Sequence, residues 1–258
     1  MPEGFRSLEP QLLVWMVAML RPGAAFFAAP ITGSSQVPLQ LRLVISLAIG
    51  IPAVQLSGLH LPPDGMISAD GLFLAIGEIV IGLALGFALQ AGFAAALVAG
   101  ETISNSMGLG FASMINPTNG QSSSAIGQLL TMMATFLFLA SDGHLLFARI
   151  LVESYRAFPP GGSIPLQLFS ELSGLGGLIF GAGLAIALPV AAALVLVQLI
   201  MGVLSRSAPS LNLFSVGMPA AMVSGIILLA MTAPLMADAI LAAIRQGLDV
   251  AARLSHGG

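Results

Sequence analysis

The amino-acid sequence predicts an all-α integral membrane protein. Hydrophobic residues make up 57% of its 258 residues and charged residues only 7%, whereas an ordinary soluble domain has about 25% charged residues. The mean hydropathy is +1.00. The apolar residues are gathered in long stretches, separated by short pieces rich in glycine, proline and serine. Since a spanning helix needs roughly 20 apolar residues, this length fits about six hydrophobic segments in a single integral membrane domain over residues 1–258.

Each of the six stretches is expected to form a helical segment, and several of them should be broken. They run from about Leu12 to Ile31, Leu39 to Leu56, Leu72 to Ala99, Leu129 to Val152, Leu175 to Leu204 and Val216 to Ala237. Between the third and the fourth, Gly100 to Gln128 is expected to form a long loop.

Four of these stretches are poor as simple membrane spans. Arg21 and Pro22 interrupt the first, and Glu78 lies in the third. The fourth is cut at Ser141-Asp142-Gly143, and the fifth continues for about 30 residues around Pro189, which exceeds a straight span. Because broken helices and intramembrane charges are tolerated only where protein or water surrounds them, we expect other helices to enclose much of this chain.

Several classes of function are excluded by composition. All eight basic residues are arginines and there is no lysine, so the basic clusters that bind nucleic acid are missing. There is no cysteine, and His144 has no second histidine at metal-ligand spacing. No serine-nucleophile elbow or nucleotide-binding loop occurs in the sequence. We therefore expect no nucleic-acid partner, no metal, no cofactor and no enzyme activity.

One charged stripe is predicted on the fourth stretch. Asp142, Arg149, Glu153 and Arg156 fall within roughly 60° of one another on a helix, and we expect the stripe to be buried. Mutual neutralisation through the i,i+4 pair of Arg149 and Glu153 and the i,i+3 pair of Glu153 and Arg156 is the simplest interpretation. A proton relay and a salt bridge to a partner subunit are the alternatives.

Two pairs of glycines at i,i+4 spacing indicate close helix packing. They are Gly82 with Gly86 and Gly177 with Gly181. Small residues at this spacing let the backbones of neighbouring helices approach each other in a membrane. The pattern predicts helix packing sites without naming the neighbours.

The segment from Met107 to Gln128 is the most distinctive loop. It is uncharged, rich in glycine and serine, and about 20 residues long, which is longer than a loop without function usually is. It starts with apolar residues and then breaks at Asn116-Pro117, where proline disfavours helix in its predecessor. A plug folded into a cavity and a plain disordered loop are both compatible with this pattern.

Four segments together resemble the FliR family of flagellar export-gate proteins and its counterparts in injectisome type III secretion. They are RPGAAFFAAP followed by VPLQLRL at Arg21 to Leu43, GETISNSMGLGFASMINPTNG at Gly100 to Gly120, DGHLLFARILVESYRAFP at Asp142 to Pro159, and LNLFSVGMP at Leu211 to Pro219. Their order and spacing carry the resemblance. The DGH and NLFSVGMP pieces look more flagellar than injectisome-like.

The resemblance implies a structural and gating subunit of a protein-conducting channel. It implies hairpins in a hetero-oligomeric helical assembly with FliP and FliQ homologues, an FlhB homologue as neighbour, and unfolded flagellar export substrates as cargo. The assembly would lie in the bacterial inner membrane at the flagellar basal body. In the family, the loop that matches residues 107–121 closes the channel, which carries a plug role onto Met107, Phe111, Met114, Ile115, Asn116 and Pro117.

A small-solute or ion transporter is the competing interpretation, because transporters also use broken helices and buried charges. Such a protein should consist of two related halves. Residues 1–128 and 129–258 show no convincing correspondence and no matched pair of interrupted segments. The export gate therefore ranks above the transporter.

Overall fold

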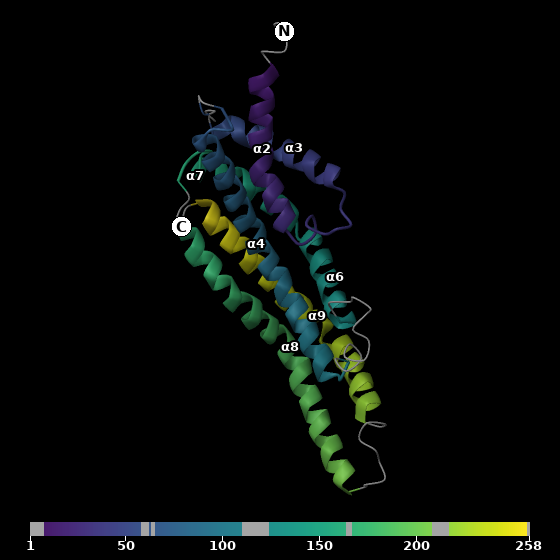
Figure 1. Ribbon diagram of the computed structural model, residues 1–258. Coiled ribbons are helices and arrows are strands. Elements are labelled where there is room, and N and C mark those ends of the chain that lie inside the picture. The colour runs from purple at the N-terminus through teal and green to yellow at the C-terminus, as the bar shows by residue number, and fades with distance from the viewer. Residues whose placement is uncertain are drawn as a thin grey trace. The chain divides into compact units, whose positions relative to one another are not determined.

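The computed structural model describes residues 8–57, 62, 65–109, 124–163, 167–207 and 217–256, and all secondary structure in these ranges is helical (Figure 1). The helices are α2 (Leu8–Ala28), α3 (Leu39–Ser57), α4 (Ala69–Ser106), α6 (Ala125–Ala140), α7 (Gly143–Ala157), α8 (Gln167–Ser207) and α9 (Met218–His256). The predicted all-α membrane fold is confirmed.

The break predicted in the fourth stretch is present. α6 ends at Ala140, α7 begins at Gly143, and the two helices are bent by 70° relative to each other. Asp142 occupies the left-handed region with φ 56°, which Asp and Asn tolerate better than other non-glycine residues. Its carbonyl then accepts the N–H groups of Leu145 and Leu146 at 3.0 and 3.1 Å. A left-handed residue thus lies between the two helices, where the chain changes direction.

Several of the predicted helices were too short. α4 continues through Gly100 to Ser106, where a loop was expected, and α9 continues past Ala237 to His256. Hydropathy reports which side chains can face lipid, whereas helix persistence depends on backbone hydrogen bonds and on the absence of breakers. Glu101, Asp238 and Arg245 end the apolar pattern without ending the helix.

Four of the described helices are long and apolar enough to cross a membrane: α2, α4, α8 and α9. The bent pair of α6 and α7 forms a fifth span if it is counted as one. α3 is apolar but shorter, over Leu39–Gln55. Length and composition thus give four or five candidate spans in the described chain instead of six. The chain is a multi-pass membrane protein.

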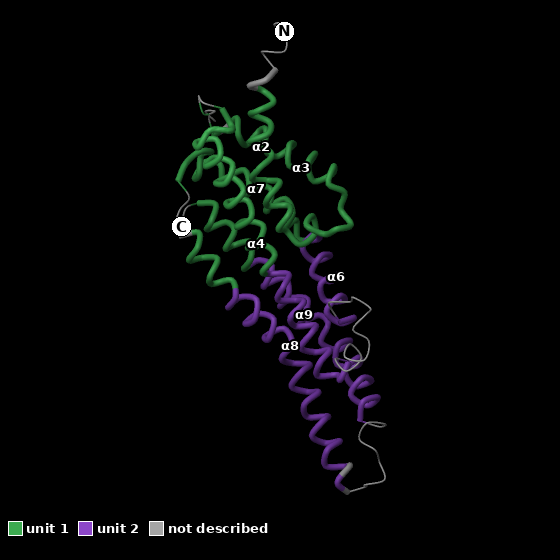
Figure 2. The backbone as a smooth tube through the Cα atoms, viewed as in Figure 1, with its two compact units in different colours: residues 1–91, 141–175, 246–258 green, residues 92–140, 176–245 purple. Residues whose placement is uncertain are grey.

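The chain divides into two compact units (Figure 2). Unit 1 contains residues 1–91, 141–175 and 246–258, and unit 2 contains residues 92–140 and 176–245. Helices α4, α8 and α9 each contribute residues to both units. The single domain expected over residues 1–258 stays a prediction.

Unit 1 is built around α2, which packs on α3, α4 and α7. Ala18 of α2 is buried with Ala53 and Val54 of α3 and Tyr155 of α7. The contact with α3 is close, because a Cβ at Gly50 would lie 2.7 Å from the carbonyl carbon of Ala18. Small residues therefore let α2 lie against its neighbours with little space between backbones.

Unit 2 is built around the second half of α4, residues 92–106. A Cβ at Gly100 would lie 2.7 Å from the backbone nitrogen of Gly127 on α6, and a Cβ at Gly183 on α8 would lie 2.8 Å from Val98. Phe93 and Phe138 meet edge-to-face with ring centroids 5.5 Å apart, a favourable geometry for aromatic pairs. Glycine contacts thus bring α6 and α8 onto α4.

Candidate functional site

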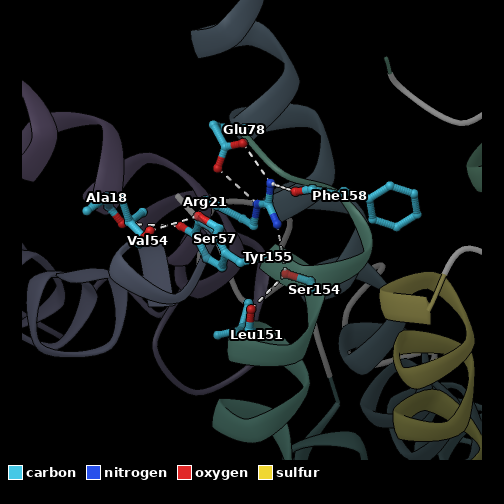
Figure 3. Close-up of polar contacts among 9 residues, drawn as sticks. All are labelled: Ala18, Arg21, Val54, Ser57, Glu78, Leu151, Ser154, Tyr155 and Phe158. Carbon is cyan, nitrogen blue, oxygen red and sulfur yellow. Dashed lines mark hydrogen bonds and ion pairs between the residues drawn. The ribbon is translucent and has the colours of Figure 1, made fainter. Parts of the chain in front are cut away.

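A buried ion pair joins α2 to α4 in unit 1. Arg21 is fully buried and Glu78 is 1% exposed. The guanidinium donates from Nε to Oε2 of Glu78 at 2.9 Å and from Nη2 to Oε1 at 2.6 Å (Figure 3). This two-point geometry is the strongest form of an arginine–carboxylate contact. The two charges that interrupt separate apolar stretches therefore neutralise each other.

α7 supplies the remaining partners of the guanidinium. Nη1 of Arg21 donates to the Ser154 hydroxyl at 3.1 Å, and Nη2 also donates to the carbonyl of Phe158 at 2.8 Å (Figure 3). The guanidinium carbon lies 4.0 Å from the centroid of the Tyr155 ring, which places the cation over the negative face of the aromatic system. A buried charge is stable only when its hydrogen bonds are made, and Arg21 meets this condition through α4, α7 and the residue that follows α7.

The proline that follows Arg21 is compensated by the same cluster. Pro22 has no N–H, so the carbonyl of Ala18, four residues earlier in α2, loses its helical partner. The hydroxyl of Tyr155 donates to this carbonyl at 3.3 Å (Figure 3). Tyr155 therefore stabilises both the buried cation and the carbonyl that the proline leaves free.

The sequence indicated these residues without showing their pairing. Arg21 and Glu78 are 57 positions apart, so no helical spacing connects them. The only available signal was that two apolar stretches carry single charges of opposite sign. Two isolated charges inside spans are expected to meet each other, because neither is stable alone in a low-dielectric environment.

The predicted burial of the charged stripe on α7 is wrong for the chain by itself. Asp142, Arg149 and Arg156 are exposed, and Glu153 is only partly buried. In the described chain, the carboxylate of Glu153 lies 3.9 Å from Nε2 of His256 and is not within ion-pair distance of either arginine. The reason is that the face of α7 opposite the stripe carries the residues that fill the core, including Phe147, Ile150, Leu151 and Tyr155.

The two predicted glycine pairs behave differently. A Cβ at Gly82 would lie 2.9 Å from Ala24 and would collide with the carbonyl of Arg21, and one at Gly86 would lie 2.8 Å from Ala28. This pair therefore seats α2 on α4 within unit 1. Around Gly177 and Gly181 on α8, nothing lies within 4 Å of the Cβ position.

The loop after α4 leaves the helix through a fully hydrogen-bonded end. Gly108 has φ +81°; its N–H donates to Asn105 and the Leu109 N–H donates to Ser104, both at 3.0 Å. These two bonds define a Schellman motif, which requires the left-handed residue that glycine provides. The Ser106 carbonyl accepts from Nε2 of Gln198 on α8 at 2.7 Å.

Met107 lies at this helix end and is 1% exposed. A Cβ at Gly225 on α9 would lie 2.7 to 2.8 Å from the Cγ, Sδ and Cε atoms of Met107. The methionine side chain thus fills the space that the glycine leaves on α9, within unit 2. The other residues expected in the plug lie outside the described residues: Phe111, Met114, Ile115, Asn116 and Pro117.

The chain returns to the described structure at Ser124, which caps α6. The Ser124 hydroxyl accepts the Gly127 N–H at 3.0 Å, as an N-cap residue does. The backbone N–H of Ser124 donates to Oε1 of Glu101 at 2.6 Å. No role for Ser124 was predicted from the sequence; its signal was a serine just before an apolar helical run.

The geometry provides hydrogen-bonded anchors and close helix contacts, and no reaction chemistry is built from them. Among the described residues, no group of three or more histidine, cysteine, aspartate or glutamate side chains could hold a metal ion. The candidate functional site is the base of the loop in unit 2, defined by Glu101, Met107, Gly108, Ser124 and Gly225.

Known proteins match most of the chain. Residues 12–247 match the family of bacterial export proteins, family 1. The flagellar biosynthetic protein FliR of Escherichia coli (strain K12) is 37% identical over 222 residues, covering 85% of this chain and 84% of the relative. That of Pectobacterium carotovorum subsp. carotovorum is 37% identical over 195 residues and 75% of each chain. That of Bacillus subtilis (strain 168) is 31% identical over 211 residues and 80% of each chain.

The family match over residues 12–247 includes the loop base and the buried ion pair. The family match and the relatives together confirm the resemblance found in the sequence, and they favour the flagellar export apparatus over a small-solute transporter. The chain therefore belongs to the bacterial export proteins, family 1, the family of flagellar biosynthetic protein FliR, and it is a multi-pass membrane subunit of the flagellar export apparatus and not an enzyme.

Proposed function

We propose that this chain is one sector of a protein-conducting gate and contributes the loop that closes it. In this proposal the chain assembles with FliP and FliQ homologues, with an FlhB homologue nearby, in the bacterial inner membrane at the flagellar basal body. Unfolded flagellar export substrates pass through the channel. The loop after Met107 is the plug.

The hydrogen-bonded geometry of the loop base is the observation that supports the plug role of the loop. Glu101, which holds Ser124, lies seven residues before Gly108 on α4, or about 10 Å along the helix at 1.5 Å per residue. The described residues on either side of the loop therefore lie near one place. Backbone hydrogen bonds fix the end at Gly108 and Leu109, and side-chain acceptors fix the end at Ser124. A plug needs such fixed ends, because the entropic cost of holding a segment in a channel is lower when its two ends are already held close together.

The apolar face of α8 supports assembly with other helical subunits. Exposed large apolar side chains follow this helix from Phe169 to Leu204, including Phe180, Leu188, Leu196 and Leu199. That stretch is about 50 Å long at 1.5 Å per residue, whereas the hydrocarbon core of a bilayer is about 30 Å thick. Lipid alone cannot cover it, so we infer that protein partners cover part of this face.

Deleting residues 111–117 tests the plug. This change leaves Gly108, Leu109 and Ser124 in place, so the loop base should still form. We expect the assembled complex to be recovered and the ion conductance of vesicles that contain it to rise severalfold. Unchanged conductance with a normal yield of complex would remove the plug from the proposal.

The partner assignment is tested by purification in mild detergent and identification of the co-purifying chains. We expect FliP and FliQ homologues in the complex with the native chain. Replacing both Gly177 and Gly181 with leucine should reduce their recovery, because bulky side chains would prevent close helix approach there. A double variant that recovers both partners at normal yield would show that these glycines do not form the packing site.

A further inference from the structure

The buried face of α7 fixes the direction in which its charged side chains point. Phe147 meets Phe26 of α2 edge-to-face, with ring centroids 6.3 Å apart. Further along α7, the hydroxyl of Tyr155 donates to the Ala18 carbonyl of α2 (Figure 3). Both side chains are buried, so α7 is held on α2 at two points about 12 Å apart along its axis. The opposite face of α7 therefore turns away from the core of unit 1.

That opposite face carries the charged stripe. Arg149 and Arg156 are exposed, and they lie about 10 Å apart along α7 and roughly 20° apart around it. With Asp142 and Glu153, the stripe reads negative, positive, negative, positive along the chain and carries no net charge. It is therefore an alternating pattern and not a patch of one sign.

The two arginines of the stripe have no acidic partner in the described chain. Glu153 follows Arg149 by four residues and precedes Arg156 by three, which is close enough on a helix to pair with either. Its carboxylate lies 3.9 Å from Nε2 of His256 on α9 instead. No carboxylate among the described residues lies within ion-pair distance of Arg149 or Arg156. Both guanidinium groups can therefore take a further carboxylate.

Apolar side chains are exposed on the same side of the helix. Leu145 and Leu146 lie four and three residues before Arg149 and are 61% and 44% exposed. Lipid tails would cover these leucines but would leave the arginine in a medium where a charge is costly. Water would solvate the arginine but not the leucines. A protein partner covers both, and arginine is enriched at protein interfaces whereas lysine is depleted.

The order of the charges favours a protein helix over a lipid surface. The phosphates of anionic lipids attract basic residues, but they would also repel Asp142 and Glu153. A partner helix can instead place a carboxylate opposite each arginine and keep its carboxylates away from the two acids. Charge complementarity of this kind fixes the register of two partners and suppresses binding of wrong ones.

We propose that the charged stripe of α7 is a docking surface for a helix of another subunit of the export apparatus, one that presents two carboxylates about seven residues apart. One carboxylate pairs with Arg149 and the other with Arg156. Each planar guanidinium donates two parallel hydrogen bonds to its carboxylate. This inference rests on the proposed function, in which the chain assembles with other helical subunits, and it adds a place and a chemistry for one of those contacts.

Carbodiimide cross-linking of the assembled complex tests this surface, because the reagent condenses a lysine amine with a carboxylate that the amine contacts. The chain has no lysine, so Arg149→Lys or Arg156→Lys gives it a single one, and the native chain gives the background. We expect each variant to be joined to a carboxylate of another subunit, located by mass spectrometry of the joined peptides. The two carboxylates should lie on one helix of one partner, about seven residues apart.

Three further variants calibrate this result. Arg253→Lys should be joined to Glu171 of the same chain, because Nη2 of Arg253 lies 3.2 Å from Oε2 of Glu171. Ala157→Lys places an exposed amine on α7 beside the stripe and should be joined to the partner severalfold less than Arg156→Lys. The double change Arg149→Glu with Arg156→Glu should lower recovery of the joined subunit severalfold in mild detergent, because like charges would then face each other.

The other outcomes overturn the docking surface. A main product that joins Arg149→Lys or Arg156→Lys to a carboxylate of the same chain would show that the stripe is neutralised internally. A product of twice the mass of the chain would show that a second copy covers the stripe. No product from either variant, while Arg253→Lys reacts, would show that the stripe faces water or lipid phosphates. A product from only one of the two variants would refute the two-point contact.

The proposed function is tested separately in the same preparation. If FliP and FliQ homologues co-purify with the native chain and neither Arg149→Lys nor Arg156→Lys is joined to another subunit, the docking surface fails while the proposed assembly stands. If no other subunit co-purifies with the native chain, the proposed assembly fails and the docking surface fails with it.

Discussion

Close glycine contacts join helices in both units, but the two units differ in their buried polar side chains. Unit 1 contains five of the six buried polar side chains among the described residues: Arg21, Ser46, Glu78, Ser154 and Ser255. Unit 2 contains the sixth, Ser104. Unit 2 has no buried ion pair among its described residues, and it brings α4, α6 and α9 together at glycines, where a side chain would meet the opposing backbone or the side chain of Met107.

This difference teaches how each unit fixes the register of its helices. A two-point ion pair is satisfied in one arrangement only, so Arg21 and Glu78 select one position of α2 against α4. We infer that this specificity is why the charges are retained, although a buried pair is often no more stabilising than apolar packing. Glycine contacts also select a register, but by excluded space.

Breaking the ion pair between Arg21 and Glu78 should give the largest loss of stability. Arg21→Met leaves Glu78 buried without its partner, and the loss of one member of a buried pair costs about 3–5 kcal/mol. We expect little folded protein in membranes, measured as the yield of complex and its unfolding temperature in detergent. Arg253→Met removes an exposed pair, with Arg253 and Glu171 side chains 55% and 34% exposed, and should change stability by less than about 1 kcal/mol.

The double variant Arg21→Met with Glu78→Leu sharpens this prediction. It removes both charges, so no group is left unpaired, and we expect most of the lost yield to return. If the double variant is as unstable as Arg21→Met alone, the ion pair is not the cause of the loss.

Filling the glycine contact between α4 and α6 in unit 2 should give the next largest loss of stability. Gly100→Ala places a methyl group 2.7 Å from the Gly127 nitrogen, and overpacking of this kind costs about 1–3 kcal/mol. The unfolding temperature of the complex should fall. Gly174→Ala, where nothing lies within 4 Å of the Cβ position, is the matched control and should be neutral or slightly stabilising, because alanine favours helix. Equal effects of the two changes would contradict the contact.

The Tyr155 hydroxyl should contribute a smaller amount that depends on Pro22. Tyr155→Phe leaves the Ala18 carbonyl without a partner and should cost about 1–2 kcal/mol. Pro22→Ala restores an N–H that can bond to that carbonyl within α2. The cost of Tyr155→Phe should therefore be smaller in a Pro22→Ala background, measured by a double-mutant cycle of unfolding temperatures. An unchanged cost would show that the hydroxyl does not compensate for the proline.

The smallest effect is expected at Gly108. This residue has φ +81°, and nothing lies within 4 Å of its Cβ position. Gly108→Ala should cost only about 1 kcal/mol, from backbone strain alone. Gly108→Asn should be better tolerated than Gly108→Ala, because asparagine accepts left-handed conformations more readily. The unfolding temperatures of the complexes that contain these two variants give the comparison. A higher unfolding temperature for Gly108→Ala than for Gly108→Asn would contradict the Schellman motif at the end of α4.

The sequence was sufficient for the fold class, the break at Asp142 and the packing of Gly82 and Gly86, because these depend on local composition and spacing. It was insufficient for the ends of α4 and α9, because a change in hydropathy does not break a helix. It also did not show the contacts that join Arg21 to Glu78 and Glu101 to Ser124. Such pairs depend on which helices become neighbours, and no spacing along the chain encodes that.

The measurement that tests the loop base most directly is thiol labelling in the assembled complex. The native chain has no cysteine, so an introduced cysteine is the only thiol of this chain, and its labelling is read on this chain after the subunits are separated. Met107 is 1% exposed while Asn105, two residues earlier, is exposed. We expect Met107→Cys to resist a small maleimide until the complex is denatured, whereas Asn105→Cys should react at once. Rapid labelling of Met107→Cys in the intact complex would contradict the burial of Met107 against Gly225 at the base of the loop.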